Sequence, residues 1–251
     1  MSYTNTNLNS SLSECSISSA YSKSIRYMRR IFKYDQMDFQ FAFWQMLYLF
    51  VSPQKLIRMF QARKYTKSQY ARDDPAFLVL FSGVLCLTSV GISIVLNLSF
   101  MQFIKFLFFV IFVDTIGIGL ILATILWYLT NTFMKPKINL RDIEWGFSLD
   151  MHFNAFFPPL ILLHFIQLFF YNWLISKDLF VSILLGNMFW LGAAFYYVYI
   201  SFLGYNSLQI LNHTRVFLAP IPWFVVFYFA SLFFEWNISH SVMNFYKYRV
   251  L

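Results

Sequence analysis

Two ionisable side chains fall inside long apolar stretches, where a charge is costly. Asp114 lies near the middle of the run Phe103–Leu129, and His164 lies about the middle of Phe156–Ile175. An ionised Asp at the centre of a membrane-spanning helix costs roughly 2.5–3.5 kcal/mol on insertion scales. We therefore expect its carboxyl group to face other helices and either to hold a proton or to meet a partner, for which His164 is the candidate. The pair predicts a proton or ion site, or a polar lock between helices.

A second group of ionisable residues precedes the third apolar run. Glu144, Asp150 and His152 fall within nine residues, and with His164 they have the chemistry of a hard or borderline metal site. Their spacing matches no dedicated ligand motif, because Asp150 and His152 are two apart and would point to different sides of a helix. We therefore expect no metal here, and predict hydrogen bonding at the membrane interface instead.

The segment ARDDP contains Arg72 and the paired acids Asp73 and Asp74. Paired acids hold Mg²⁺ in some membrane transferases, but those enzymes need further acids at a set spacing, which this sequence lacks. An acid before Pro75 is typical of a helix start, since Pro is tolerated at the first helical position. The segment is interpreted as a helix cap with a salt bridge.

Motifs of the common enzyme classes are absent from the sequence. It has no Gly-rich phosphate loop, no HExxH, no GxSxG and no CxxC, and its two cysteines, Cys15 and Cys86, lie far apart. We therefore predict a protein that is not an enzyme, with no catalytic residue, no cofactor and no metal.

Basic residues gather in the first 77 residues, which carry 11 Lys and Arg against 5 Asp and Glu. On a helix, Lys23, Arg26, Arg30 and Lys33 share one face. Such a face is expected either to adsorb to an anionic lipid leaflet or to stay solvated and enforce topology, with RNA binding as a further alternative. The predicted membrane or partner surface consists of Lys23, Arg26, Arg29, Arg30, Lys33, Lys55 and Arg58.

The elements that carry these residues are helices in a membrane. With 59% hydrophobic residues, 12% charged residues and 33 Phe, the chain has more apolar surface than a small globule can bury. Five runs are long enough to span: Phe77–Leu98, Phe103–Leu129, Phe156–Ile175, Leu179–Leu203 and Val216–Phe234. The predicted fold class is an all-α integral membrane protein with five transmembrane helices.

The remaining segments flank this bundle. Residues 1–22 form a polar tail that we expect to be disordered. Residues 23–76 are predicted to form cytosolic amphipathic and interfacial helices, because Phe39–Val51 is apolar yet reaches only about 20 Å against a hydrocarbon core of about 30 Å. The bundle is expected over 77–234, followed by a lumenal C-terminal segment over 235–251.

The distribution of Lys and Arg predicts the orientation. With a cytosolic N-terminus, 15 basic residues lie on the cytosolic side and 4 on the other. The positive-inside rule favours that arrangement, and five spans then put the C-terminus in the lumen. The lumenal basic residues include Lys247 and Arg249.

Several long stretches resemble the Unc-fifty family of Golgi membrane proteins. They are MDFQFAFWQMLYLFVSPQ, ARDDPAFLVL, EWGFSLDMHFNAFFPPLILLHFIQLFF, FLGYNSL and FYKYRV, in one order over about Ile31–Leu251. The resemblance implies a five-span Golgi protein that acts in early secretory traffic, associates with large Arf exchange factors and aids delivery of nicotinic-type receptors. It also implies, as an alternative, an RNA-binding role at the inner nuclear membrane. It supplies no catalytic residues.

Three function classes follow from the sequence. The leading hypothesis is a trafficking factor whose partners are an anionic lipid leaflet, an Arf exchange factor and membrane-protein cargo. The second is a transporter, channel or lipid-handling protein that uses Asp114 and His164. The third is an RNA-binding membrane protein. The expected location is the Golgi membrane, with the endoplasmic reticulum or inner nuclear membrane as alternatives.

Overall fold

The computed structural model describes residues 37–67, 74–136, 142–177, 179–208 and 210–251, with the side chains of 63–67 left aside. Within these ranges the chain is helical and contains no strand. Five continuous helices in them are long and apolar enough to cross a membrane. They are Ala76–Val95, Phe100–Met134, Trp145–Ile175, Phe180–Asn206 and Thr214–Phe233. The predicted fold class is confirmed.

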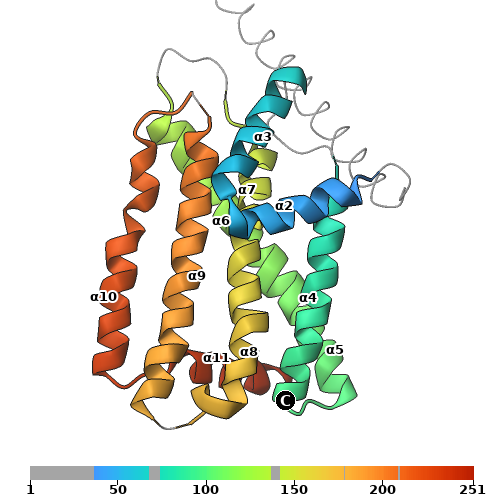
Figure 1. The fold of residues 1–251 in the computed structure, drawn as a ribbon, viewed down its shortest axis with the longest axis vertical. Coiled ribbons are helices and arrows are strands. Elements are labelled where there is room, and N and C mark those ends of the chain that lie inside the picture. Colours follow the sequence, from blue (N-terminus) through green and yellow to red (C-terminus); the bar gives the residue numbers. More distant parts are fainter. Residues whose placement is uncertain (1–36, 68–73, 137–141, 178, 209) are drawn as a thin grey trace, which may run out of the picture.

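Each span is built from one or more helical segments, of which Figure 1 labels the α-helical ones. The first is α4 (Ala76–Val95) and the fourth is α9 (Phe180–Asn206). The second consists of α5 (Phe100–Phe108), η2 (Phe109–Gly117), α6 (Ile118–Leu129) and η3 (Thr130–Met134). The third consists of α7 (Trp145–Ile161), η4 (Leu162–Ile166), α8 (Gln167–Phe170) and η5 (Tyr171–Ile175). The fifth consists of η6 (Thr214–Leu218) and α10 (Pro220–Phe233).

The outer surface of the bundle is apolar. Large hydrophobic side chains such as Phe112, Ile121, Phe169 and Trp223 are exposed along the spans. A soluble protein rarely shows such continuous apolar surface, whereas a bilayer provides an apolar solvent for it. Polar side chains are instead found between the helices, where other parts of the chain can bind them.

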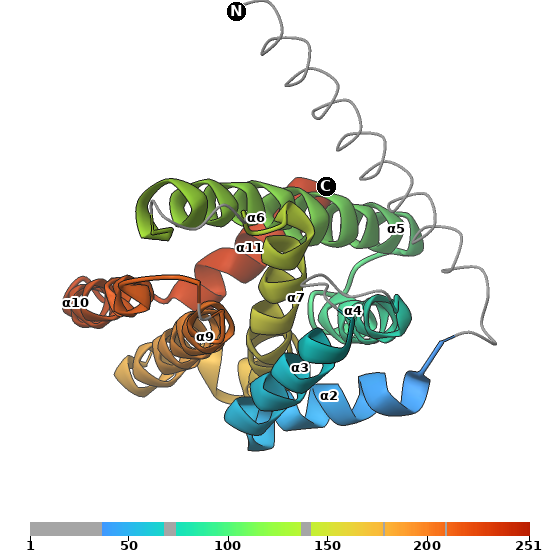
Figure 2. The ribbon, with the colours of Figure 1, turned by 90° about the horizontal axis from the view of Figure 1, so that it is seen from above.

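The third span lies at the centre of the bundle, and α7 packs against α9, α6 and α2. The predicted span begins at Phe156, but the helix begins at Trp145. The difference arises because Ser148, His152 and Asn154 lower the hydropathy while being buried between helices. The second span also runs past the predicted end at Leu129 to Met134, and Figure 2 shows it inclined to the bundle axis, so its 35 residues fit a bilayer by tilting.

The short apolar run forms α2 (Phe39–Val51), which lies across one end of the bundle (Figure 1). The Asp38 side chain caps its first turn by accepting a hydrogen bond from the Phe41 N–H. One face of α2 packs on α4 and α7 and buries Ala42, Met46 and Leu49. A second helix, α3 (Pro53–Lys67), starts at the proline that follows Ser52.

The C-terminal residues form a further helix, α11 (Ile238–Val250), at the end of the bundle opposite α3 (Figure 1). It packs against α9 and α5, so it closes the base of the bundle rather than extending away from it. The sequence predicted only a C-terminal segment for these residues. Its return to the bundle places Arg249 beside the second span.

Candidate functional site

Asp114 is held by an ion pair to Arg249, which the sequence analysis had not considered as its partner. Arg249 Nη1 and Nη2 donate to the two Asp114 carboxylate oxygens, each at 2.7 Å. Their side chains are 13% and 24% exposed respectively, so the pair is largely shielded from solvent. A planar guanidinium matches a carboxylate in this two-bond geometry, which is stronger and more directional than a single bond.

Aromatic rings surround the guanidinium. Its carbon lies 4.7 Å from the ring centre of Phe109, 5.3 Å from Phe245 and 5.4 Å from Tyr246. These rings favour a cation and exclude water from the pair. The hydrogen bonds to Asp114 raise the pKa of Arg249, which keeps it charged. This arrangement ties α11 to the π-helical stretch η2 of the second span.

His164 does not bond Asp114 directly, so that expected pairing is corrected. The His164 Nδ1 atom is buried and has no hydrogen-bond partner among the described residues. Its ring instead lies edge-on to Tyr246, at 6.2 Å between ring centres. The sequence could not show this, because Arg249 approaches Asp114 only after α11 folds back under the bundle.

The predicted cluster of Glu144, Asp150 and His152 does not form a common site. His152 is buried, and its Nδ1 lies 2.9 Å from the Tyr197 hydroxyl of α9. Glu144 precedes α7, and its backbone carbonyl accepts from Phe147, while the Asp150 carbonyl accepts from Asn154. Within the described ranges, no three His, Cys, Asp or Glu side chains gather closely enough to hold a metal ion.

The His152 ring packs closely against Gly119, where α7 crosses α6. A methyl group built on Gly119 of α6 would lie 2.9 Å from both Cδ2 and Nε2 of the His152 ring. Only a glycine leaves room for the imidazole at this crossing of α6 and α7. Gly204 of α9 has the same role beside Met151.

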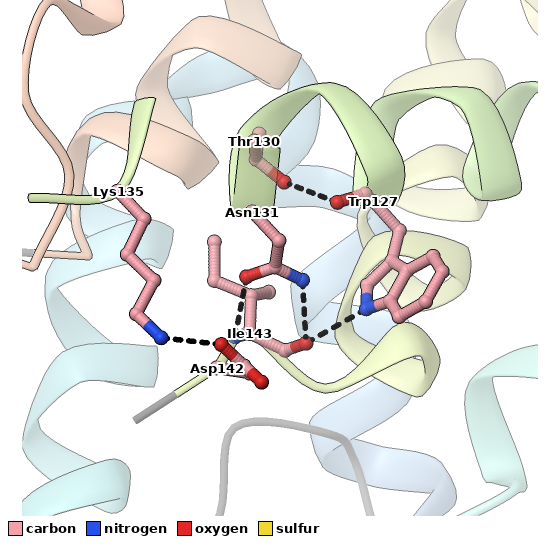
Figure 3. A network of polar contacts seen from close by, with 6 residues as sticks. All are labelled: Trp127, Thr130, Asn131, Lys135, Asp142 and Ile143. Carbon is pink, nitrogen blue, oxygen red and sulfur yellow. Dashed lines mark hydrogen bonds and ion pairs between the residues drawn. The ribbon is translucent and has the colours of Figure 1, made fainter. Parts of the chain in front are cut away.

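A network of polar contacts fastens the start of α7 to the end of the second span (Figure 3). We call this the loop clamp, and it consists of Trp127, Thr130, Asn131, Lys135, Asp142 and Ile143. The Asn131 amide brackets the Ile143 backbone, accepting from its N–H at 2.9 Å and donating to its carbonyl at 3.2 Å. The Trp127 indole N–H donates to the same carbonyl at 2.9 Å, and Lys135 pairs with Asp142. None of these contacts was expected from the sequence.

Asp74 of the ARDDP segment joins two helix starts. One carboxylate oxygen accepts from the Ala76 N–H at 3.0 Å, at the beginning of α4, and the other accepts from the Asp38 N–H at 2.9 Å, just before α2. The negative charge therefore satisfies free N–H groups at two helix N-termini. Arg72 and Asp73, the other members of the predicted cap and salt bridge, lie outside the described residues.

Two of the seven residues of the predicted basic surface lie within the residues that the structure describes. Lys55 and Arg58 are exposed on α3, and the Lys55 ammonium lies 5.0 Å from the ring centre of Tyr48. The other five residues, Lys23, Arg26, Arg29, Arg30 and Lys33, lie outside the described residues. Two hydrogen bonds fix α3 to α9, from Gln54 to the Tyr199 hydroxyl and from Gln61 to the Ser207 carbonyl.

A second network joins the end of α10 and the start of α11 to the bundle. The Asn187 amide donates to Ser231 and to the Trp236 carbonyl, and its oxygen accepts from the Ile238 N–H. The Asn237 amide donates to the Ile175 carbonyl at 2.8 Å. Asn187 is a polar residue inside the fourth apolar run. Its polarity is the one signal in the sequence that indicates a need for a partner within the bundle.

These arrangements hold helices together by hydrogen bonds and one buried ion pair. Both Asp114 carboxylate oxygens are bound by the Arg249 guanidinium, so neither faces a metal ion or another ligand. His152 has a tyrosine hydroxyl as its neighbour. The contacts of Asp114, His152 and Asn187 thus join one helix to another.

Comparisons with known proteins give one consistent result. The model of the UNC-50 family matches residues 27–247. The chain is 56% identical to the protein unc-50 homolog of Drosophila melanogaster over 92% of this chain and 84% of the relative. It is 49% identical to the Rattus norvegicus homolog and 48% identical to the Homo sapiens homolog, each over 92% of this chain and 90% of the relative. No solved structure matches it.

Proposed function

The chain belongs to the UNC-50 family, and on that premise we propose that it is a Golgi membrane protein of vesicle and protein trafficking. In this proposal it recruits or assists an Arf guanine-nucleotide exchange factor and aids the assembly or delivery of membrane receptors. It acts by binding, without a catalytic step. Its partners are an anionic lipid leaflet, the exchange factor and membrane-protein cargo.

The attachment of the basic helix α3 to α9 is the observation that best supports the proposal. Lys55 and Arg58 are exposed on a helix that is hydrogen-bonded to α9 through Gln54 and Gln61. A fixed basic surface binds an acidic partner with less loss of conformational entropy than a free tail does. The loop clamp lies at the same end of the molecule, where it joins the end of the second span to Asp142 and Ile143 just before α7.

The orientation belongs to the proposal as well. A cytosolic N-terminus puts α3 and the loop clamp on the side where an exchange factor is soluble. It is supported by the 15 basic residues on that side against 4 on the other. The C-terminal helix α11 then faces the lumen.

Cargo contact is proposed for the apolar flank of the bundle at α10. This helix packs mainly on α9 and exposes Trp223, Phe229 and Phe233 on its outer side. Helices of another membrane protein can pack there within the bilayer, where van der Waals contact drives association.

The alternative functions lose support from the geometry. A transporter or ion site at Asp114 would need a carboxylate available to its ligand, and Arg249 already binds both oxygens. RNA binding has no support among the described residues beyond the basic character of α3.

Charge reversal on α3 tests the proposal. The variant Lys55→Glu with Arg58→Glu is expressed in cells in place of the normal chain, and the amount of exchange factor on Golgi membranes is measured. We expect a loss of most of the recruited factor, because the charges of Lys55 and Arg58, the two cations on α3 whose side chains are described, change from positive to negative. The control is Lys177→Glu, an exposed cation at the opposite end of the bundle. Unchanged recruitment at normal protein abundance would contradict the proposal.

A further inference from the structure

A small cavity lies where the C-terminal helix meets the bundle. Its volume is about 20 Å³, and its polar lining comes from His164, Gln167, Trp190, Ser239 and Tyr246. The remaining described residues of its wall are apolar. The wall therefore joins the first span, the third span, α9 and α11 around one polar space.

The size of the cavity fits one small molecule. A site needs roughly 10–15 Å³ to hold a single water, and two to four polar partners to bind it. The volume of about 20 Å³ is large enough for one water and too small for a larger ligand.

His164 provides the first partner. Its Nδ1 is buried without a hydrogen-bond partner among the described residues, and a buried polar atom left in that state is unfavourable. Water satisfies this nitrogen in either tautomer of the ring, because a water molecule both donates and accepts.

Ser239 provides the second partner. Its oxygen accepts from the Gln167 amide and from the Trp190 indole N–H, the latter at 3.1 Å. With both lone pairs engaged, the Ser239 hydroxyl hydrogen is left to point at an acceptor. A water in the cavity can accept it and bond His164 on its other side.

A cation is excluded by the charges around the space. None of the described residues in the wall is acidic, and the carboxylate of Asp114 is paired with Arg249. A bound cation would meet the neighbouring guanidinium without a counter-charge. The small volume and the lack of a counter-charge for a cation therefore favour a water molecule as the ligand.

We propose that this cavity holds one internal water molecule that bridges His164 Nδ1 and the Ser239 hydroxyl, and so joins α11 to the third span. This joint lies next to the Asp114–Arg249 ion pair and gives α11 a second polar attachment. It is independent of the trafficking role.

A density map of the full chain in lipid nanodiscs, detailed enough to show ordered waters, tests the proposal directly. We expect a peak at about 2.7–3.2 Å from both His164 Nδ1 and Ser239 Oγ. Absence of that peak in a map that shows waters elsewhere in the protein would overturn the proposal, as would a closed cavity with Nδ1 bonded to a side chain.

Hydroxyl-radical labelling by radiolysis gives a second readout, because it oxidises side chains next to bound water. Two buried methionines form a matched pair: Met243, 5% exposed, lines the cavity, and Met151, 2% exposed, packs against Gly204. We expect Met243 to oxidise several-fold faster than Met151, and His164→Phe to remove that excess. His240→Phe on α11 is the control and should preserve it. Equal oxidation of the two methionines in the unaltered chain would overturn the proposal.

Discussion

The ion pair between Asp114 and Arg249 predicts a large loss of stability when one partner is removed. Arg249→Gln leaves the carboxylate of Asp114 without its two hydrogen bonds inside the second span. Breaking a fully buried pair costs about 3–5 kcal/mol. With side chains 13% and 24% exposed, we reduce the expected cost to about 2–3 kcal/mol.

The expected change is measurable by thermal unfolding of the purified protein. For a chain of this length, 1 kcal/mol shifts the midpoint by roughly 2–4 °C, so Arg249→Gln should lower it by about 4–12 °C. Arg249→Lys should lower it less, since an ammonium keeps the charge but loses the two-bond geometry and the ring contacts. Lys247→Gln, an exposed cation two residues away, is the matched control and should stay within about 0.5 kcal/mol of the unaltered chain.

A double-mutant cycle gives the result that would refute this reasoning. Asp114→Asn alone should also destabilise the protein, whereas Asp114→Asn with Arg249→Gln should cost clearly less than the two single changes together. Residues in direct contact show such coupling, and independent residues do not. If the double variant loses the simple sum of the single losses, the ion pair does not join α11 to the bundle.

Three further predictions concern the other contacts between helices. Gly119→Ala puts a methyl group 2.9 Å from the His152 ring and should cost about 1–3 kcal/mol in thermal unfolding, whereas Gly192→Ala, with nothing within 4 Å, should be tolerated. Asn131→Ala removes the bracket on the Ile143 backbone and should cost about 1–3 kcal/mol, seen as faster limited proteolysis between the second and third spans, with Thr132→Ala as the exposed control. Asp74→Ala removes the shared cap of α2 and α4 and should lower the free energy of unfolding by about 1–2 kcal/mol. Asp74→Asn should lower it less, because the amide oxygen can still accept a hydrogen bond. Equal losses in both variants would contradict the capping role.

The parts of the fold set by local pattern could be predicted. A helix is predicted over Phe39–Val51 and is observed with those bounds, because Asp38 caps its start and Ser52 with Pro53 ends it. The five spans follow from runs of apolar residues that need no knowledge of tertiary contacts. Family membership followed from long motifs in a fixed order, and it is confirmed by the match over residues 27–247.

The site could be predicted only in part, because its partners come from distant segments. The polarity of Asp114 was visible, but its partner is 135 residues away and reaches it through the return of α11. The sequence places His152 in a loop before the third span because the apolar run begins only at Phe156. Its neighbour Tyr197 lies on another helix. A sequence pattern indicates that a polar residue in a membrane needs a partner, and only packing decides which partner it meets.

Direct binding of an Arf exchange factor tests the central claim of the trafficking role. The full chain is reconstituted in vesicles, purified exchange factor is added, and the fraction that floats with the vesicles is measured. We expect binding to vesicles that contain the unaltered chain or Lys177→Glu, and loss of most binding when Lys55→Glu and Arg58→Glu are combined. Equal flotation with and without the protein in the vesicles, or equal flotation for all three chains, would contradict it.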